Sequence, residues 1–516
     1  MKQYLVTASE MKRYDTNTIE KYRIPSLLLM ERAALVTVEE LQRTCGMEPC
    51  RVLIAAGCGN NGGDGLAVGR LLMLQGYEVT CVLLGSEEQC TQETARQIAI
   101  LWEYETQIFS TIQNGEYDIV IDAIFGIGLS RAVEGIYKEA IQWINNTKAF
   151  VCSVDIASGI CADTGEVMGC AVQADLTVTY GFYKIGHMLY PGAGYGGDIV
   201  CGQMGIDSRS FLGEEPYWYT CQDQCMLPAR SPDGNKGTFG KVMIIAGSEQ
   251  IAGAAMMAAK SVLRIGAGMV KVVTAESNKE SIQQFVPEAM LLTYDENTAL
   301  CQMLKNVEAW ADCILIGPGI GMGKQAQTLL RFAIQESGLP LVIDADGLNL
   351  LAQDHALQEA VMEKGAQGRT IVLTPHLGEF ARLYGCSVSE AKSHLTGYPV
   401  EYADRMHCIV VCKDARSVVV WPGGRQGYLN TTGNAGMATA GAGDVLAGIV
   451  TGLLAQNMAG TEAAVTGVYL HGVAGDLAAR MKTEVSMMAT DIIDQIGNAA
   501  AMQTAAGKQG RAGKRL

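Results

Sequence analysis

The 516-residue sequence has few histidines and no excess of basic residues. It contains six histidines, and its 54 acidic residues outnumber 39 basic ones, which gives a formal net charge of −15. Because the phosphate backbone of a nucleic acid attracts basic proteins, this balance argues against a general nucleic-acid binder. It does not exclude an anionic nucleotide, which backbone N–H groups at the start of a helix can hold.

Long apolar runs and paired cysteine motifs are also missing. No apolar run reaches the length of a membrane span, and residues 1–21 lack the apolar core of a secretory signal. The 16 cysteines are scattered and form no C-x-x-C motif. Scattered cysteines in a chain without a signal are typical of reduced thiols that serve as small core residues. We therefore expect a cytoplasmic protein that does not bind a membrane.

The length and the pattern of apolar runs predict two α/β domains. A chain of this length exceeds the usual size of a single core. Thr7 and Glu10 form a capping-box pattern that predicts a helix to about Lys21. Short apolar runs then alternate with amphipathic segments, which predicts a parallel, Rossmann-like three-layer sandwich. The strands expected in this first domain are Arg51–Ala56, Glu78–Leu84, Asp118–Ala123, Ala149–Val154 and Leu176–Tyr180.

A proline-containing segment without periodicity, residues 205–233, interrupts this alternation. The second half restarts it with a small-residue helix at Gly253–Gly266 and seven apolar runs. These expected strands are Lys241–Ala246, Met269–Thr274, Cys313–Gly317, Leu341–Asp344, Thr370–Thr374, Ile409–Cys412 and Ser417–Trp421. The pattern predicts a first domain over 1–218, a second over 225–505 and a disordered tail over 506–516. The tail is expected because its composition is basic, rich in glycine and aperiodic.

A glycine-rich turn, GCGNNGGDG at residues 57–65, follows the first strand expected in the sheet. Its glycines fit G-x-G-x-x-G before a helix expected at Leu66–Leu74, which favours a phosphate at the start of that helix. A standard NAD site also has an acidic residue at the end of the second strand, and here that strand ends in Gly85 and Ser86. The turn is therefore predicted to bind a nucleotide in some other way.

Carboxylates follow two further strands and belong to the same expected site. Asp122 precedes the glycine segment 126–128, and Asp155 precedes Ser158 and Gly159. Because parallel strands end at one edge of a sheet, Asp64, Asp122 and Asp155 are expected to share a pocket. The alternative for Asp122 and Asp155 is that each only caps the turn that follows it.

The motifs of the first half resemble the NAD(P)H-hydrate epimerase domain over nearly all of residues 1–215. The resemblance rests on GCGNNGGDG, on DAIFGIG at 122–128, on VDIASG at 154–159 and on the segment 181–192. It implies that Asp155 contacts the substrate as the catalytic acid/base, and that potassium is ligated by Asn61, Asp122 and Ser158, oxygen ligands that suit such a cation. It also implies that hydrated dinucleotide is bound by Asn60, Asn61, Gly62, Gly63, Asp64, Gly126, Ile127, Gly128, Leu129, Ser130, Arg131 and Ala132. Ala157 stands where the family usually has proline.

In the second half, the sequence Gly441-Ala-Gly-Asp444 opens an apolar helix. Its N–H groups and the positive end of the helix dipole suit a phosphoryl group that is being transferred. Asp444 is placed to accept a proton from a substrate hydroxyl, although an acidic residue there can also serve only to stabilise the helix. His376 follows a strand end and precedes a Gly-x-Glu turn, which favours a site over the packed position usual for a lone histidine.

These segments resemble the ribokinase-like, ADP-dependent NAD(P)H-hydrate dehydratase family over about residues 225–505. The combination of TPHLGE at 374–379 with GNAGMATAGAGD at 433–444 is distinctive. The resemblance implies substrate contacts at Ala254, Gly319, His376 and Asp444. It implies ADP contacts at Lys413, Asp414, Ala415, Arg416, Ser417 and Gly443, where Asp414 replaces the usual glycine.

Together the two resemblances imply a bifunctional NAD(P)H-hydrate repair enzyme. The first domain would equilibrate the R and S epimers of hydrated NADH and NADPH, and the second would dehydrate the S epimer with ADP and Mg²⁺. We expect a homo-oligomer. Two alternatives are a small-molecule kinase fused to a nucleotide-sensing domain, and an epimerase-like domain that only binds. Retention of Asn61, Asp122, Asp155 and Ser158 argues against the second of these.

Overall fold

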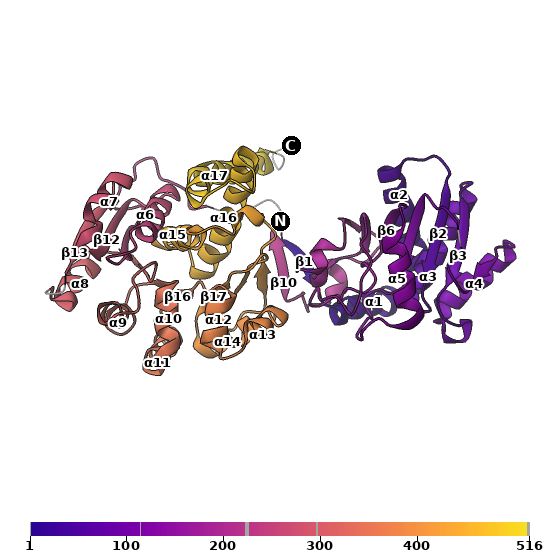
Figure 1. Cartoon of the computed structure of the whole chain (residues 1–516), viewed down its shortest axis with the longest axis horizontal. Helices are drawn as coiled ribbons and strands as arrows, with labels where there is room; N and C mark the ends of the chain where they lie inside the picture. Colours follow the sequence, from indigo (N-terminus) through magenta and orange to yellow (C-terminus); the bar gives the residue numbers. More distant parts are fainter. Residues whose placement is uncertain (1, 114, 222–226, 296–297, 513–516) are drawn as a thin grey trace. The chain divides into compact units, whose positions relative to one another are not determined.

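The computed structural model describes residues 2–113, 115–221, 227–295 and 298–512, with side chains up to residue 503. The chain forms two compact units (Figure 1). One spans Tyr4–Trp218, and the other spans Tyr219–Leu516 together with Met1–Gln3. No helix in the described part of the chain is both long enough and apolar enough to cross a membrane.

The N-terminal unit is built on a seven-stranded sheet of order β4-β3-β2-β5-β6-β7-β9, in which every neighbouring pair is parallel. Its strands are β2 (Arg51–Ala56), β3 (Glu78–Leu83), β4 (Ile108–Phe109), β5 (Ile119–Ala123), β6 (Phe150–Val154), β7 (Leu176–Tyr180) and β9 (Asp198–Gly202). Its helices are α1 (Ala8–Tyr22), α2 (Ser26–Cys45), α3 (Asn60–Leu74), α4 (Gln92–Glu103) and α5 (Gly135–Asn146). Outside this sheet, β1 (Lys2–Val6) pairs with β8 (Tyr183–Lys184).

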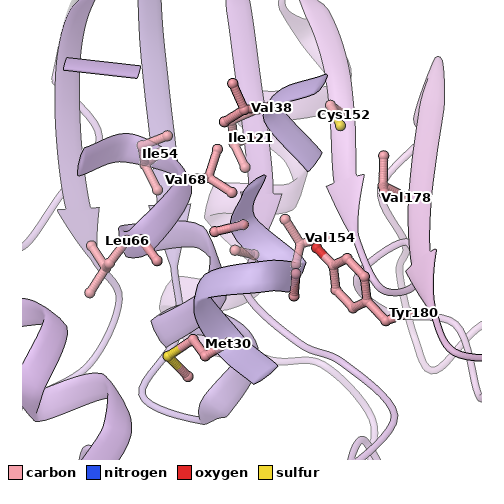
Figure 2. Packing of buried hydrophobic residues seen from close by; sticks show 14 of the residues in the cluster. Met30, Val38, Ile54, Leu66, Val68, Ile121, Cys152, Val154, Val178 and Tyr180 are labelled. Carbon is pink, nitrogen blue, oxygen red and sulfur yellow. The ribbon is translucent and has the colours of Figure 1, made fainter. Parts of the chain in front are cut away.

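Alternating residues of the strands bury opposite faces of this sheet, as the geometry of a strand requires. Ile54 and Ile121 pack with Val38 of α2 and Val68 of α3, as Figure 2 shows. The neighbouring residues, among them Leu53, pack instead with side chains of α5. Helices therefore cover both faces, and the predicted three-layer sandwich is confirmed.

The C-terminal unit contains the strand order β13-β12-β11-β14-β15-β16-β17-β18-β19. All pairs up to β17 are parallel, and β18 and β19 add an antiparallel edge. The strands are β10 (Trp218–Cys221), β11 (Lys241–Ile245), β12 (Met269–Ala275), β13 (Met290–Tyr294), β14 (Cys313–Ile316), β15 (Leu341–Ile343), β16 (Ile371–Leu373), β17 (Ile409–Cys412), β18 (Val418–Val420) and β19 (Gly427–Leu429).

Two helices of this unit matter for the site, α6 (Gly253–Arg264) and α15 (Ala442–Ala455), which pack on each other and on the sheet. Because α15 is apolar on all sides, every residue from Val445 to Ala455 is buried. The remaining helices are α7 (Lys279–Phe285), α8 (Leu300–Glu308), α9 (Lys324–Arg331), α10 (Asp346–Gln353), α11 (His355–Ala366), α12 (Leu377–Tyr384), α13 (Val388–Ser393), α14 (Tyr398–Met406), α16 (Gly460–Lys482) and α17 (Ala489–Ala512).

Two expectations from the sequence differ from the structure. Helix α3 begins at Asn60 and not at Leu66, so the polar residues after Gly59 form the first turns of a helix. Helix α17 continues to Ala512, where a disordered tail was expected from residue 506. Residues 506–512 comprise two alanines, one lysine, one glutamine and one arginine, which are helix formers, and two glycines, which are not. Residues 513–516 of the expected tail lie outside the described residues.

Candidate active sites

The start of α3 lies against the ends of β2 and β5, at a distance that only glycine permits. A Cβ atom on Gly57 would lie 2.1 Å from the carbonyl oxygen of Ile124, and one on Gly62 would lie 1.7 Å from that of Gly57. A Cβ atom on Gly65 would lie 2.3 Å from Ala123 Cβ. The glycines of this turn therefore serve close packing, which places the first turn of the helix at the edge of the sheet.

A cavity of about 770 Å³ opens at this edge. Most of the residues expected to hold substrate line it: Asn60, Asn61, Asp64, Gly126, Ile127, Gly128, Leu129, Ser130, Arg131 and Asp155. Gly62, Gly63 and Ala132 do not line it. Gly62 lies against Gly57, and Gly63 lies against Met30 and Thr94, so both serve the packing of α3.

Asp122 is a fully buried hydrogen-bond acceptor beneath this cavity. Its Oδ2 accepts bonds from Ser153 Oγ at 2.7 Å and from the Ser158 N–H at 2.9 Å, and its Oδ1 accepts one from the Ile124 N–H at 3.4 Å. Burial raises the pKa of Asp122, although the bonds from Ser158, Ser153 and Ile124 oppose the rise. Asp122 thus joins the ends of β5 and β6 whatever else it binds.

Asn61 and Ser158 lie on opposite sides of the segment 125–126. Ser158 Oγ accepts a bond from the Phe125 N–H at 2.9 Å, and Asn61 Oδ1 lies 3.1 Å from the position of a Cβ atom on Gly126. The three residues expected to hold potassium therefore offer an amide, a carboxylate and a hydroxyl oxygen. The buried amide nitrogen of Asn61 has no hydrogen-bond partner among the described residues.

Asp155 is held by a buried lysine. Its backbone is in the left-handed region, with φ 66°, and its Oδ1 forms an ion pair with Lys184 Nζ. Lys184 is 1% exposed and also donates to Thr179 Oγ1 at 2.7 Å. Since Asp155 lines the cavity and pairs with Lys184, its carboxylate is not a simple turn cap.

His187 supports the backbone of the same residue. Burial, followed by the charge of Lys184, lowers the pKa of His187 to about 3, so its ring is neutral. Its Nδ1 accepts a bond from the Lys184 N–H at 3.1 Å, which leaves Nε2–H to donate to the carbonyl oxygen of Asp155 at 3.0 Å. The ring thus helps to fix the left-handed turn at Asp155.

Asp64 faces the same cavity with a different protonation tendency. Burial raises the pKa of Asp64 well above its usual value, and the nearby carboxylates of Asp155 and Asp15 raise it further, while Lys184 opposes them. The cavity therefore combines a carboxyl that resists ionisation with a carboxylate that is paired to a cation, an arrangement that suits proton donation and acceptance within one site.

In the C-terminal unit, the ends of β15, β16 and β17 bring charged groups together. Asp344 is buried, and its Oδ1 accepts bonds from Lys413 Nζ at 2.8 Å and from Thr374 Oγ1 at 2.8 Å. A Cβ atom on Gly443 would lie 3.1 Å from Lys413 Nζ and 4.0 Å from Asp344 Oδ2. The expected nucleotide residues Lys413 and Gly443 are therefore neighbours at the start of α15.

Asp444 stands in the first turn of α15, next to this cluster. Burial raises the pKa of Asp444 to about 7, with a further rise from Asp344 and a smaller opposing effect of Lys413. A carboxyl with this pKa is an efficient general base near neutral pH.

The loop after β14 connects this cluster to α6. A Cβ atom on Gly319 would lie 3.2 Å from Ala254 Cβ, so these two expected substrate contacts are adjacent. At the other end of the loop, the Gly321 N–H donates to Asp346 Oδ2 at 2.9 Å. The expected contacts on α6 and on the loop therefore belong to the same edge of the sheet.

His376 serves as the N-cap of α12. Its Nδ1 accepts bonds from the N–H groups of Gly378 at 3.0 Å and Glu379 at 3.4 Å, which leaves Nε2 as the N–H of the neutral ring. Burial lowers the pKa of His376, and the charges of Lys413 and Arg382 lower it further. A parallel bridge between His376 and Lys413 places this histidine beside the cluster. Its structural and its expected binding role are thus compatible, since its side chain is 56% exposed.

The other expected nucleotide contacts form the turn between β17 and β18. Ser417 Oγ donates to the Asp414 carbonyl oxygen at 3.3 Å, and Arg416 Nη1 donates to the Thr431 carbonyl oxygen at 2.7 Å. Ala415 lies between them in the chain. These bonds fix the shape of the turn beyond Lys413.

Comparisons with known proteins cover both units. A model of the YjeF-related protein N-terminus matches residues 26–186, and a model of NAD(P)H-hydrate dehydratase matches residues 242–498. A bifunctional NAD(P)H-hydrate repair enzyme of Moorella thermoacetica is 36% identical over 95% of each chain. The chain belongs to this family of bifunctional repair enzymes.

Other members and a solved structure are similar as well. The Escherichia coli bifunctional NAD(P)H-hydrate repair enzyme is 34% identical over 86% of this chain and 84% of its own. A crystal structure of the ADP/ATP-dependent NAD(P)H-hydrate dehydratase from Bacillus subtilis with ATP and Mg²⁺ is 27% identical, with a TM-score of 0.45. It covers 53% of this chain and 94% of the Bacillus chain.

Three residues of the repair enzyme's N-terminal site were missed by the sequence analysis: Tyr180, Lys184 and His187. Tyr180 and Lys184 line the cavity, and His187 holds the Asp155 backbone. The available signal was a lysine within the short aromatic segment Gly181-Phe-Tyr-Lys184 that follows an apolar strand, because lysine is rarely buried without a partner. Ala157, which stands where the family usually has proline, is buried beside the turn at Asp155.

Proposed function

We propose that this chain repairs hydrated NADH and NADPH in two steps. The N-terminal unit interconverts the R and S epimers, and the C-terminal unit dehydrates the S epimer with ADP as co-substrate. The observation that carries the proposal is Asp444, a carboxyl with a pKa raised to about 7 beside the glycines that open α15. Its neighbours Lys413 and Asp344 add the charged groups that phosphoryl transfer requires.

For dehydration, we propose that the substrate hydroxyl is first phosphorylated. Hydroxide is a poor leaving group, since the pKa of water is about 15.7. Asp444 accepts the hydroxyl proton while the oxygen attacks the terminal phosphorus of ADP, which releases AMP. The ester is then expelled as inorganic phosphate by the lone pair of the ring nitrogen. The resulting iminium ion loses a proton from the ring carbon next to the one that carried the phosphate, which restores NADH or NADPH. The N–H groups that open α15 stabilise the phosphoryl oxygens.

Mg²⁺ fits this site only together with the nucleotide. Among the described residues, no three histidine, cysteine or acidic side chains are arranged to hold a metal by themselves. Mg²⁺ is commonly bound by one or two carboxylates plus substrate phosphates, and Asp344 supplies such a carboxylate beside Lys413. When bound with ADP, it would offset the charge of the phosphates.

For epimerisation, we propose that Asp155 is the acid/base that acts next to the reacting carbon. Lys184 holds its carboxylate, and His187 holds its backbone. Asp64, whose pKa is raised by burial and by the charge of Asp155, is suited to donate a proton in the same cavity. The N–H groups at the start of α3 and the segment 126–131 would bind the dinucleotide phosphates and ribose.

We propose potassium for the site formed by Asn61, Asp122 and Ser158. All three provide oxygen donors, and the unsatisfied Asn61 amide supports the assignment. Because amide oxygen and nitrogen exchange places on a flip, turning Asn61 would present its oxygen at the buried position that now lacks a partner. A bound cation would add positive charge beside the cavity.

Replacing Asp122 by asparagine is expected to raise the potassium concentration needed for half-maximal epimerisation by about tenfold, or about 1.4 kcal/mol of ion binding. Asparagine is preferred to alanine, because alanine would leave the Ser153 hydroxyl and the Ser158 N–H unpaired. Rates are measured against potassium, with sodium holding the ionic strength constant. Dehydration of pure S epimer is the internal control, and an unchanged potassium dependence would show that Asp122 is only structural.

The two activities are expected to separate. We propose a first domain over residues 1–218 and a second over 225–505, and a chain that ends after residue 218 should still equilibrate the epimers, because its cavity and sheet lie wholly within it. The measurement is the rate of interconversion by chromatography. A folded truncated chain that is no faster than buffer would refute the assignment of the epimerase to this domain.

The decisive experiment for the whole proposal is incubation of the full chain with hydrated NADH or NADPH, ADP and Mg²⁺. Return of absorbance at the reduced nicotinamide band supports dehydration, whereas a stable phosphorylated product would support the rival kinase. We also propose that the protein works in the cytoplasm as a homo-oligomer. Light scattering of the purified chain tests the oligomer.

A further inference from the structure

Two cysteines outside the proposed chemistry lie side by side at the N-terminal cavity. Cys58 lines the cavity in the turn between β2 and α3, and Cys90 ends the short helix Glu87–Gln89. Both sulfhydryls donate to the carbonyl oxygen of Ser86, at 3.5 Å from Cys58 and 3.8 Å from Cys90, so the two sulfurs are neighbours on one acceptor. The pair therefore shares one small polar site.

The backbone holds the two cysteines in this position. The Thr91 N–H donates to the carbonyl oxygen of Cys58 at 3.0 Å, and Thr94 Oγ1 donates to that of Gly59 at 2.9 Å. Both cysteines are partly exposed, whereas thiols such as Cys81 and Cys152 are fully buried in the sheet.

We propose that Cys58 and Cys90 form a reversible disulfide that inhibits the epimerase site. With hydrogen peroxide as the oxidant, the Cys58 sulfur attacks one peroxide oxygen, the O–O bond breaks, and a sulfenic acid and water result. The Cys90 sulfur then attacks the Cys58 sulfur, the S–O bond breaks, and a second water leaves. Two thiols and one peroxide thus give one disulfide and two waters, and a dithiol reverses the change.

The order of the two steps follows from the surroundings of each sulfur. Burial, followed by the charge of Cys58, raises the pKa of Cys90 to about 12, so Cys90 is a slow first nucleophile. Cys58 lies at the cavity, where peroxide has access. Once Cys58 is a sulfenic acid, Cys90 is the neighbouring thiol on the same carbonyl oxygen.

Inhibition is expected because the bond would shift residues that the proposed function uses. Closing a bond of about 2.05 Å between two sulfurs that now each donate to the Ser86 carbonyl oxygen draws residues 57–59 toward residues 86–90. Asn60 and Asn61 follow directly, and Thr91 and Glu93 line the same cavity. A displacement of about 1 Å in an active site can cost about 100-fold in rate. This inhibition rests on the proposed epimerase, whereas formation of the bond does not.

The test is to treat the reduced full chain with hydrogen peroxide and measure three properties. We expect a peptide in which Cys58 and Cys90 are cross-linked by mass spectrometry, a fall of about tenfold or more in epimerisation, and recovery with dithiothreitol. Dehydration of pure S epimer should not change. Absence of the cross-linked peptide, or a cross-link without loss of epimerisation, would overturn the proposal.

Two variants give matched controls. Cys90→Ser, which changes a residue that does not line the cavity, should epimerise normally and resist peroxide. Cys50→Ser removes a thiol that precedes β2, at the strand end opposite the cavity, and should remain sensitive. Equal sensitivity of Cys90→Ser would overturn the proposal. If the reduced wild-type chain does not epimerise at all, the proposed function fails, and the peptide map still decides whether the disulfide forms.

Discussion

Replacing Asp444 by asparagine is expected to lower the dehydration rate by about 10²–10⁴-fold and to leave epimerisation unchanged. Asparagine keeps a polar group in the first turn of α15 but cannot accept the proton of the substrate hydroxyl. Dehydration is followed by the return of reduced nicotinamide absorbance, and epimerisation by chromatography of the same protein. A dehydration rate near that of the wild type would rule out Asp444 as the base.

The pH dependence of the wild type provides a second test of the same residue. Because the pKa of Asp444 is raised to about 7, the fraction of the ionised base falls about tenfold for each pH unit below 7. Dehydration should therefore decline along this acidic limb, and the residual rate of Asp444→Asn should not. An acidic limb that persists in the variant would assign the titration to another group.

The same replacement should stabilise the protein at neutral pH. The pKa of Asp444 is higher in the folded chain than its usual value of 3.8, so the carboxyl favours folding below pH 3.8 and this contribution is lost as the pH rises through 7. Asparagine avoids the loss, which is on the order of a few kcal/mol. Thermal melting should show a higher Tm for Asp444→Asn at pH 8 and little difference near pH 4.

The sheet strands were largely predictable from the sequence, because strands buried on both faces of a parallel sheet are uninterrupted apolar runs. β2, β7 and β17 begin and end at the predicted residues, and the capping box at Thr7 is present. The two-residue strands β4 and β8 were missed, since two residues carry no periodicity, and the longer strands β1, β9, β10, β13 and β19 were missed as well. Helix α3 was predicted to begin too late, because close packing of its glycines against β2 and β5 overrides their low helix propensity.

The candidate site was predictable only where strand ends carry polar residues. Asp64 and Asp155 do line one cavity, as the convergence of parallel strands implies, whereas Asp122, expected in the same pocket, is fully buried and does not line it. The partners that set their charge were not predictable, because Lys184 reaches Asp155 across the fold and Lys413 reaches Asp344 in the same way. Such ion pairs form between residues that are far apart in the sequence, so a local sequence pattern does not predict them.

Asp122 shows that a carboxylate at the end of a strand can cap the following turn and still be available to bind an ion. The turn-capping alternative is present in the structure, since Asp122 accepts the Ile124 N–H and the Ser158 N–H. Its proposed role toward potassium uses lone pairs that remain on the same oxygens. A loss of stability in an Asp122 variant is therefore no argument against ion binding, and the potassium dependence of the rate is the measurement that decides.

Replacing Lys184 by methionine is expected to lower epimerisation by about 10²-fold or more and to destabilise the N-terminal unit by about 3–5 kcal/mol. The methionine side chain fills a similar space, but Asp155 then keeps a buried carboxylate without its cation. The hydrogen bonds that Lys184 Nζ donates to Thr179 Oγ1 and to the Tyr180 carbonyl oxygen are also lost in the variant. Chemical denaturation gives the stability, and dehydration of S epimer shows whether the C-terminal unit remains intact.

The double variant Asp155→Asn with Lys184→Met separates catalysis from folding. Removing both charges should recover part of the stability lost in Lys184→Met, because no unpaired charge is left buried. Epimerisation should not recover, because the acid/base is gone, and the double variant should be about as slow as Asp155→Asn alone. If the double variant regains both stability and epimerisation, the ion pair serves folding only and the acid/base must be sought in Asp64.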